Sequence, residues 1–481
     1  MHDSSTAKSS LWGSNEFKVG SLTYTRSALL TVMFWMLWAD LCLQIMESLP
    51  TVIPLQLKWL HASDKLIGFV KDSLPAILTV AFVPIIGMQS DRHRGKLGRR
   101  RPFLLWSTIP VCLFLTLLGY ADPLTRWLHG MMAGMTLPAV GITVIMIFAA
   151  GFFFFNLYVM QVYQYLVADV IPKEAMGTFI GLFRAIGAVG GFIFNRWIFG
   201  FAETDVHWVY VGCALLYAGA FFLLVWRVRE GEYPPPDGAG EKPGAVQFLQ
   251  RYAKECFGNP FYVKVFSIAL FYWSAWVPFM TFILFFATQT AGADFTPSLG
   301  VNVGEFGKIK GWTFLPKVLI FACLGPLVDR FHALRMLLVG IVLVTVTYLA
   351  GFFVVHTPNQ FLFWWVSNEV AQAIFQLAYL AMFPVLLPRD KYGQYFSANQ
   401  LFFSAGLIAS PVLCGWFMDV IKDYRYLFLW SGVCAALSLL FVFAVYRHWK
   451  RLGGDAGYVA PIYSEAYNSR LSPGKTAVSN L

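Results

Sequence analysis

Long apolar blocks recur along the chain between residues 27 and 446, with short polar stretches between them. A helix needs about 20 apolar residues to cross the hydrocarbon core of a bilayer. On that template the predicted spans are 27–58, 66–88, 102–120, 139–166, 176–200, 207–226, 261–288, 304–327, 335–355, 361–386, 394–420 and 425–446. Strands of membrane barrels alternate apolar and polar side chains, and runs such as AVGITVIMIFAAGFFFF do not. The pattern therefore predicts an all-α membrane protein with twelve transmembrane helices.

A long hydrophilic stretch separates the sixth span from the seventh. It begins with a Pro- and Gly-rich segment that includes Pro234, Pro235 and Pro236, and it continues as a predicted amphipathic helix. We therefore expect two six-helix bundles joined by a linker. The expected parts are an N-terminal tail (1–26), an N-terminal bundle (27–227), a linker (228–260), a C-terminal bundle (261–447) and a C-terminal tail (448–481).

The two predicted bundles also resemble each other in sequence. GMQSDRHRGKLGRRRPF follows the second span of the first half, and GPLVDRFHALRM follows the second span of the second half. The matched positions are Gly87 with Gly325, Asp91 with Asp329, and Arg92 with Arg330. A second pair, VIPKEAMGTF and LLPRDKYGQY, lies between the fourth and fifth spans of each half. Two repeats at equivalent places indicate an internal duplication, which is typical of transporters with a central site between two bundles.

Charge is scarce and unevenly distributed, since 58% of the residues are hydrophobic and 13% are charged. Basic residues gather in alternate loops, after the second, sixth, eighth and twelfth spans. This is the asymmetry of cytoplasmic loops, and it explains the formal net charge of +10 better than nucleic-acid binding. The first 26 residues are polar, and the first apolar block is too long for a signal peptide. We expect a multi-pass protein of a plasma or bacterial inner membrane with both termini cytoplasmic.

Motifs of common enzymes are missing from the sequence, which contains no GxSxG, HExxH or GxxxxGK[ST] and leaves no room for a sizeable soluble domain. Its seven cysteines form no CxxC pair, as expected for small apolar core residues rather than metal ligands. We therefore predict a transporter and not an enzyme or receptor. We expect it to work as a monomer, without a metal or cofactor.

The loop SDRHRGKLGRRRPF combines Asp91 with Arg92, Arg99 and Arg100 and has a glycine at the turn, Gly98. Such charges can tie the ends of neighbouring helices together. The loop resembles the signature cytoplasmic loop of the major facilitator superfamily. Its run RGKLGRRRPF is similar to the branch that contains the plant sucrose/proton symporters and the glycoside-pentoside-hexuronide cation symporters.

Other segments extend this resemblance over nearly all spans: QVYQYLVADVIP, GLFRAIGAVGGFIFN and GQYFSANQLFFSAGLIASP. The resemblance implies a major facilitator fold that works by alternating access, with a disaccharide or glycoside as substrate. It also implies that the two repeated loops latch the cytoplasmic side. The gating residues expected there are Gly87, Asp91, Arg92, Gly98, Arg99, Arg100, Gly325, Asp329 and Arg330.

Polar side chains inside a span are costly and usually face a cavity or a partner. In the first span Asp40, Gln44 and Glu47 recur at i, i+4 and i+7 and share one helix face. This stripe favours a substrate cavity over a single interhelical pair. Arg184 lies inside the fifth span and therefore needs an anion, which Asp40, Glu47, Asp169 or a substrate group could supply.

The tenth span carries a second polar stripe, in which Glu369, Gln372 and Gln376 recur at i, i+3 and i+7. Aligning the two repeats pairs Asn156 with Gln372, and Gln400 with the arginine of the fifth span. Sugars bind to amides and carboxylates through their hydroxyl groups. The candidate substrate-binding residues are Asp40, Gln44, Glu47, Asn156, Arg184, Glu369, Gln372, Gln376 and Gln400.

The chain departs from its apparent relatives at the ion-coupling positions. Sucrose/proton symporters place an acidic residue and an arginine in the fourth span, where this chain has Phe153 and Gln164. Melibiose-type symporters place aspartates in the second span, where this chain has Thr79 and Val83. A proton is the expected coupling ion, because protonation removes the cost of a buried charge. Its candidate carriers are Asp40, Glu47 and Glu369. An organic anion or drug, with Arg184 as counter-ion, is the alternative substrate.

Overall fold

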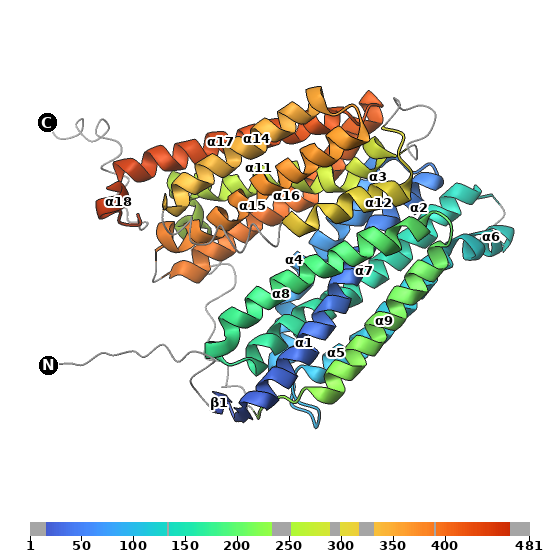
Figure 1. Ribbon diagram of the computed structural model, residues 1–481, viewed down its shortest axis with the longest axis horizontal. Coiled ribbons are helices and arrows are strands. Elements are labelled where there is room, and N and C mark those ends of the chain that lie inside the picture. Colours follow the sequence, from blue (N-terminus) through green and yellow to red (C-terminus); the bar gives the residue numbers. More distant parts are fainter. Residues whose placement is uncertain are drawn as a thin grey trace, which may run out of the picture.

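The computed structural model describes residues 16–131, 134–232, 252–288, 299–316, 331–388 and 391–461, which form two helical bundles (Figure 1). The first bundle contains α1 (Arg26–Glu47), η1 (Leu49–Val52), α2 (Ile53–Trp59), α3 (Asp64–Gly68), η2 (Phe69–Ser73), α4 (Leu74–Arg92), α5 (Arg101–Gly119), α6 (Ala121–Met131), α7 (Leu137–Val170), α8 (Lys173–Ile193), η3 (Phe194–Ile198), η4 (Phe199–Ala202) and α9 (Val206–Arg227). The second contains α11 (Pro260–Ala287), α12 (Val303–Trp312), α14 (Ala333–Val354), α15 (Pro358–Leu386), α16 (Tyr392–Ile421), α17 (Tyr426–Arg451) and α18 (Gly454–Gly457).

The predicted all-α membrane fold is confirmed. Within the described residues, eleven helices are long and apolar enough to cross a membrane. The predicted span 304–327 begins as α12, and its part beyond Pro316 lies outside the described residues. Two local features were not predicted. A short antiparallel hairpin of β1 (Glu16–Val19) and β2 (Leu22–Thr25) precedes α1, and α6 lies between the third and fourth spans.

Local sequence signals set the helix boundaries. The side chain of Thr25 accepts a hydrogen bond from the backbone N–H of Ala28 and caps α1. Proline occupies the first turn of α4, α5, α7, α11 and α15, where its missing N–H costs nothing. Asn302 and Glu305 form a capping box at the start of α12. The first span continues past α1 through the 3₁₀ turn η1 into α2.

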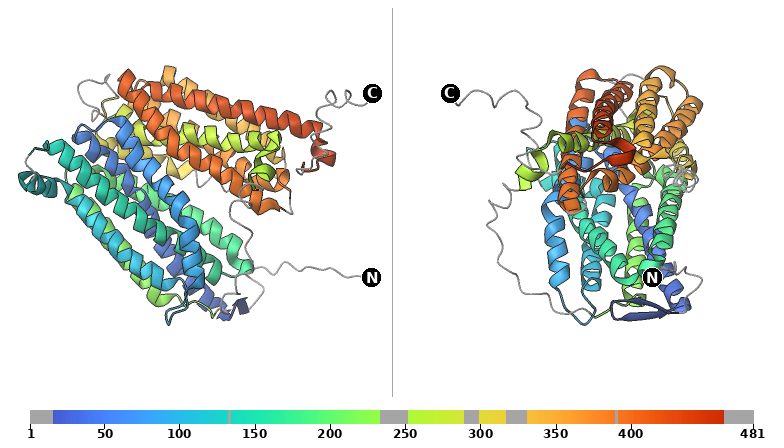
Figure 2. Two further views of the ribbon diagram at one scale, coloured as in Figure 1. Left: turned by 180° about the vertical axis from the view of Figure 1, so that it is seen from behind. Right: turned by 90° about the vertical axis from the view of Figure 1, so that its left-hand side faces the viewer.

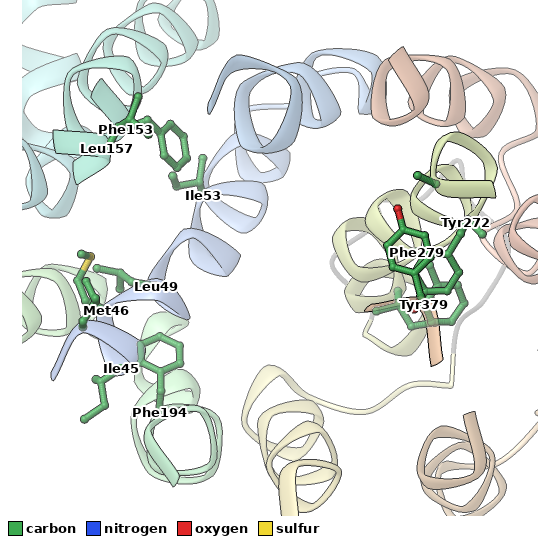
Figure 3. Close-up of a cluster of buried hydrophobic side chains, with 14 of the residues drawn as sticks. Ile45, Met46, Leu49, Ile53, Phe153, Leu157, Phe194, Tyr272, Phe279 and Tyr379 are labelled. Carbon is green, nitrogen blue, oxygen red and sulfur yellow. The ribbon is translucent and has the colours of Figure 1, made fainter. Parts of the chain in front are cut away.

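Each bundle has its own apolar interior. In the first, α5 packs against α7 and α9, and α1 against α8 and α9; in the second, α11 packs against α16 and α17, and α14 against α15 and α17. Figure 3 shows buried side chains from both interiors as two separate groups. The first group holds Ile45, Met46, Leu49, Ile53, Phe153, Leu157 and Phe194, and the second holds Tyr272, Phe279 and Tyr379.

The bundles meet at one end of the molecule and splay apart toward the other (Figures 1 and 2). We call the end that carries β1 and α18 the terminal side, and the end that carries α3 and α12 the far side. At the far side α3 and η2 pack against α16, and α12 packs against η3 and η4. The molecule is therefore closed at the far side.

Glycines allow the far side to close tightly. A Cβ added at Gly415 of α16 would collide with the backbone carbonyl oxygen of Asp64 on α3. A Cβ added at Gly307 of α12 would lie 2.5 Å from the carbonyl oxygen of Asn195 on η3. Only hydrogen in place of Cβ lets these backbones approach so closely.

Candidate substrate site and gates

The candidate residues of the first span lie where α1 crosses α8. Asp40 is fully buried, and its Oδ1 accepts a hydrogen bond from Gln44 Nε2 at 3.4 Å. The second carboxylate oxygen of Asp40 has no hydrogen-bond partner among the described residues. Gly190 lets α8 come close here, because a Cβ at that position would lie 2.9 Å from Gln44 Cβ. Gln44, the middle residue of the predicted stripe on α1, therefore faces α8.

Arg184 projects from α8 and is exposed to solvent. It interacts electrostatically with Asp40, although none of the ion pairs within 4.0 Å among the described residues includes it. Asp169 had been a candidate partner and is the wrong one, because its carboxylate binds Arg99 and Arg100. Arg184 is thus a solvent-accessible cation beside a buried carboxyl group.

A second polar group is centred on Glu47, the last residue of α1. Asn156 Nδ2 on α7 donates to Glu47 Oε1 at 2.9 Å, and Tyr217 on α9 donates through its hydroxyl to Asn156 Oδ1 at 3.1 Å. Tyr217 is fully buried, whereas Glu47 is exposed to solvent. Glu47 also lies where the span changes from α-helix to the 3₁₀ turn η1. Interrupted helices of this kind often border transporter sites.

The polar stripe of α15 forms a network inside the second bundle. Gln372 is buried; its Oε1 accepts from the hydroxyl of Tyr272 at 2.5 Å, and its Nε2 donates to the hydroxyl of Tyr348 at 2.9 Å. Gln376, which is half-buried, donates to the Tyr272 hydroxyl at 3.0 Å. Tyr272 therefore links the two glutamines, and sequence analysis had not selected it. Amide side chains buried in this way help to fix the packing of a bundle.

The last two candidates, Glu369 and Gln400, differ in burial: the first is buried and the second is exposed. Glu369 is 3% exposed, and its Oε1 accepts a hydrogen bond from Trp365 Nε1 at 3.2 Å. Gln400 is exposed on α16. The nine candidates therefore lie in separate groups: two polar groups in the first bundle and the α15 network in the second, with Gln400 on another helix.

The basic loop of the terminal side ties helices of the first bundle together. Arg100 donates to Asp91 at 2.5 Å and to Asp169 at 3.0 Å, and Arg99 makes two further hydrogen bonds to Asp169 at 2.5 and 3.0 Å. Asp91 was expected to act together with its neighbour Arg92, but its partner is Arg100, and Arg92 is exposed. The matching residues Gly325, Asp329 and Arg330 lie outside the described residues.

Glu230 is a partner of this basic loop that sequence analysis missed. Its carboxylate accepts hydrogen bonds from the backbone N–H groups of Arg99, Arg100 and Arg101, at 2.8, 3.0 and 2.6 Å. A carboxylate at the N-terminus of a helix, here α5, is favourable because of the helix dipole. Gly98 precedes this point with φ of +98°, and a Cβ there would lie 2.8 Å from the Glu230 carboxyl carbon. Gly87 faces the hydroxyl of Tyr165, 3.3 Å from an added Cβ.

Polar contacts between the bundles close the far side. Lys58 Nζ donates to Asp64 Oδ1 at 2.8 Å and to the hydroxyl of Tyr424 in the second bundle at 2.8 Å. The Tyr424 hydroxyl in turn donates to Asp64 Oδ2 at 2.6 Å. Asp419 accepts from the backbone N–H groups of Asp64 and Lys65 at 2.8 and 3.0 Å. The Lys58, Asp64 and Tyr424 side chains are buried. We call Lys58, Asp64, Asp419 and Tyr424 the far-side latch.

A second contact lies beside this latch. Lys71 Nζ pairs with Asp72 Oδ1 at 2.7 Å, and it donates to the hydroxyl of Thr281 on α11 at 2.8 Å. The Thr281 hydroxyl is also hydrogen-bonded to Asp72. The contacts of Lys71 and Asp72 with Thr281 make this ion pair part of the interface between the bundles.

Comparison with known proteins identifies the family. The family model of the Major Facilitator Superfamily matches residues 22–309 and 279–456. The chain belongs to this superfamily. The chain is 25% identical over 264 residues to the sucrose transport protein SUC4 of Arabidopsis thaliana, a match that covers 48% of this chain and 50% of that protein. The chain thus spans about half the length of this relative.

Solved structures agree with the family fold. A bacterial homologue of the human lysosomal transporter Spinster, in its inward-facing and occupied conformation, is similar with a TM-score of 0.63 and 14% identity, over 88% of this chain and 97% of that one. The D-xylose-proton symporter gives a TM-score of 0.57 and 12% identity, over 87% and 96%. The structural similarity concerns the fold, and together with the family match it identifies the chain as a multi-pass membrane protein of the Major Facilitator Superfamily.

Proposed function

We propose that this protein is a proton-coupled sugar symporter that takes up a disaccharide or glycoside by alternating access. The observation that carries the proposal is the pairing, in the first bundle, of carboxyl groups with amides on α1 and α7, next to the exposed cation Arg184. Carboxylates and amides suit sugar hydroxyls. The sucrose transport proteins among the relatives and the D-xylose-proton symporter among the similar structures support this class of substrate.

Asp40 and Glu47 are the proposed proton carriers. Asp40 is buried and faces a cation, so a proton on it changes the local charge balance and leaves Arg184 available to the substrate. Glu47 is reached by solvent and is held by Asn156, so it can exchange protons and bind sugar from the same position. Glu369 takes part through the second bundle in this proposal, and like Asp40 it is buried.

We propose that the terminal side faces the cytoplasm, because basic residues are typical of cytoplasmic loops. The structure then represents a state that is closed toward the outside. Opening outward then requires the far-side latch to separate and the terminal side to close. The Asp91, Arg99 and Arg100 cluster is proposed to brace the first bundle during that movement. Two packings of similar energy are what alternating access requires.

Uptake into proteoliposomes tests the proposal. The purified protein is reconstituted, a pH gradient is imposed, and uptake of labelled sucrose and of labelled hexoses is measured. We expect gradient-driven uptake of a sugar by the wild type and its loss in Asp40→Asn and Glu47→Gln. Asp122→Asn is the matched control, because Asp122 forms an exposed pair with Arg126 on α6. Absence of gradient-driven uptake for every sugar tried contradicts the proposal.

An organic anion is the second candidate substrate, favoured by the exposed Arg184, which forms no ion pair within 4.0 Å with any other described residue. A bound substrate raises the thermal stability of the folded protein by mass action. A thermal-shift screen of sugars and organic anions therefore separates the candidates. Stabilisation by anions that is lost in Arg184→Gln, together with no response to sugars, favours the second.

A further inference from the structure

An apolar groove runs along the outside of the first bundle, between α5 and α7. It has a volume of about 510 Å³, and its lining includes Phe103, Trp106, Ser107, Ile109, Phe155 and Tyr158. This volume is within the range of about 300–1,000 Å³ that is common for small-molecule sites. The candidate substrate residues do not line it.

One wall of the groove is α5, which packs against α6, α7 and α9, all in the first bundle, and lies on the side of that bundle remote from the second (Figure 1). Trp106 is 74% exposed and Ile109 is 54% exposed. Large apolar side chains exposed on a spanning helix contact lipid rather than water. The chemistry of the groove therefore suits an acyl chain of the surrounding membrane.

Positive charge lies at the terminal-side end of the groove. Phe103 lines that end, and the ring of His93 packs edge-on against it at 5.3 Å between centroids. His93 belongs to the loop in which Arg92, Arg94 and Lys96 are all exposed. The guanidinium group of Arg94 donates to the backbone carbonyls of Asp91 and His93, at 2.5 and 2.8 Å, which holds this charge beside the groove.

We propose that this groove binds one anionic phospholipid, with an acyl chain between α5 and α7 and its phosphate on the loop that contains Arg92 and Lys96. Charge complementarity selects an anionic headgroup over a zwitterionic one, because clustered Lys and Arg at the membrane surface attract anionic lipids. The apolar walls hold the chain, and the aromatic rings of Phe155 and Trp106 provide flat contact surfaces. The proposal is independent of which solute is transported.

Photo-crosslinking in vesicles tests this site. The full chain is reconstituted into phosphatidylcholine vesicles that contain either phosphatidylglycerol or phosphatidylcholine with the same photoreactive acyl chain, and adducts are mapped by peptide mass spectrometry. We expect adducts concentrated in residues 103–110 and 154–158, several-fold more abundant with phosphatidylglycerol. The double variant Arg92→Gln, Lys96→Gln should reduce the phosphatidylglycerol adducts to the phosphatidylcholine level.

Two further variants keep the test decisive. Arg126→Gln removes an exposed cation on the far side and should leave labelling unchanged. Ser107→Trp fills the groove and should lower labelling by both lipids, while size-exclusion chromatography confirms that each variant is folded. Equal labelling by the two lipids, or adducts spread evenly over lipid-facing helices such as α9 and α17, shows ordinary boundary lipid and overturns the proposal.

Discussion

Gly415→Ala tests the tight closure of the far side. The added Cβ would lie 2.5 Å from the carbonyl carbon of Asp64 and 2.6 Å from the backbone nitrogen of Lys65, whereas ordinary contact begins at 3.4 Å. To bring the added Cβ from 2.5 Å to 3.4 Å from the Asp64 carbonyl carbon, α16 must move away from α3 by about 0.9 Å. The obstacle is backbone, which cannot rotate away as a flexible side chain can.

The energetic cost has two sources. Overpacking of a closely packed contact costs about 1–3 kcal/mol. The same retreat lengthens the hydrogen bonds from Asp64 and Lys65 to Asp419, now 2.8 and 3.0 Å, and bonds to charged groups contribute about 1.5–3 kcal/mol each when intact. A net cost of about 2–4 kcal/mol changes a conformational ratio roughly 30- to 1,000-fold. This cost destabilises only the state in which the far side is closed, so the substitution shifts the equilibrium toward the state that is open at the far side.

Hydrogen exchange measures this shift without labels. The backbone N–H groups of Asp64 and Lys65 are hydrogen-bonded to Asp419 in the closed state. We expect the peptide that covers α3 and η2 to exchange at least tenfold faster in Gly415→Ala than in the wild type. Gly212→Ala is the control, because a Cβ at Gly212 meets no atom within 4 Å. Unchanged exchange in a folded Gly415→Ala protein would refute the closure described above.

Three further substitutions have expected outcomes. Tyr424→Phe removes the hydroxyl that is hydrogen-bonded to both Lys58 and Asp64 in the far-side latch. The free energy of unfolding should fall by about 1–3 kcal/mol, measured as a drop in Tm, and hydrogen exchange in α3 should become faster. Tyr426→Phe is the control. Tyr272→Phe leaves the buried Gln372 and the half-buried Gln376 without their common partner; a loss of about 1–3 kcal/mol is again expected, and an unchanged Tm would contradict the network. Arg100→Lys replaces the planar guanidinium, which donates to both Asp91 and Asp169, by a single point charge. Backbone hydrogen exchange in the basic loop should therefore become faster. Exchange equal to that of the wild type would show that the ion pairs of Arg100 do not stabilise the loop.

Hydropathy was sufficient to predict the spans, because lipid requires long apolar helices whose backbone groups are paired internally. α7 illustrates this, since it runs from Leu137 to Val170 around the predicted span 139–166. Periodicity also placed Asp40 and Gln44 on one face of α1, where the structure has them hydrogen-bonded. These properties depend on residues close together in the sequence.

Contacts between distant residues were beyond the same reasoning. Tyr424 lies 366 residues from Lys58, and Glu230 lies 131 residues from Arg99, so no local pattern connects them. A polar stripe also does not say which way it faces: the stripe of α1 ends at the exposed Glu47, whereas Gln372 in the stripe of α15 is enclosed by tyrosines. Both kinds of stripe have the same helical spacing. The long hydrophilic stretch gave no sign that Glu230 caps α5.

Coupling of sugar to proton movement is the central claim, and its direct measurement needs no imposed gradient. Proteoliposomes with a pH-sensitive dye trapped inside are mixed with sucrose or another sugar identified by uptake, and the internal pH is followed. We expect the sugar to drive acidification of the interior with the wild type and to have no such effect with Asp40→Asn, while Asp122→Asn behaves as the wild type. Sugar entry by the wild type without any change in internal pH would contradict the account.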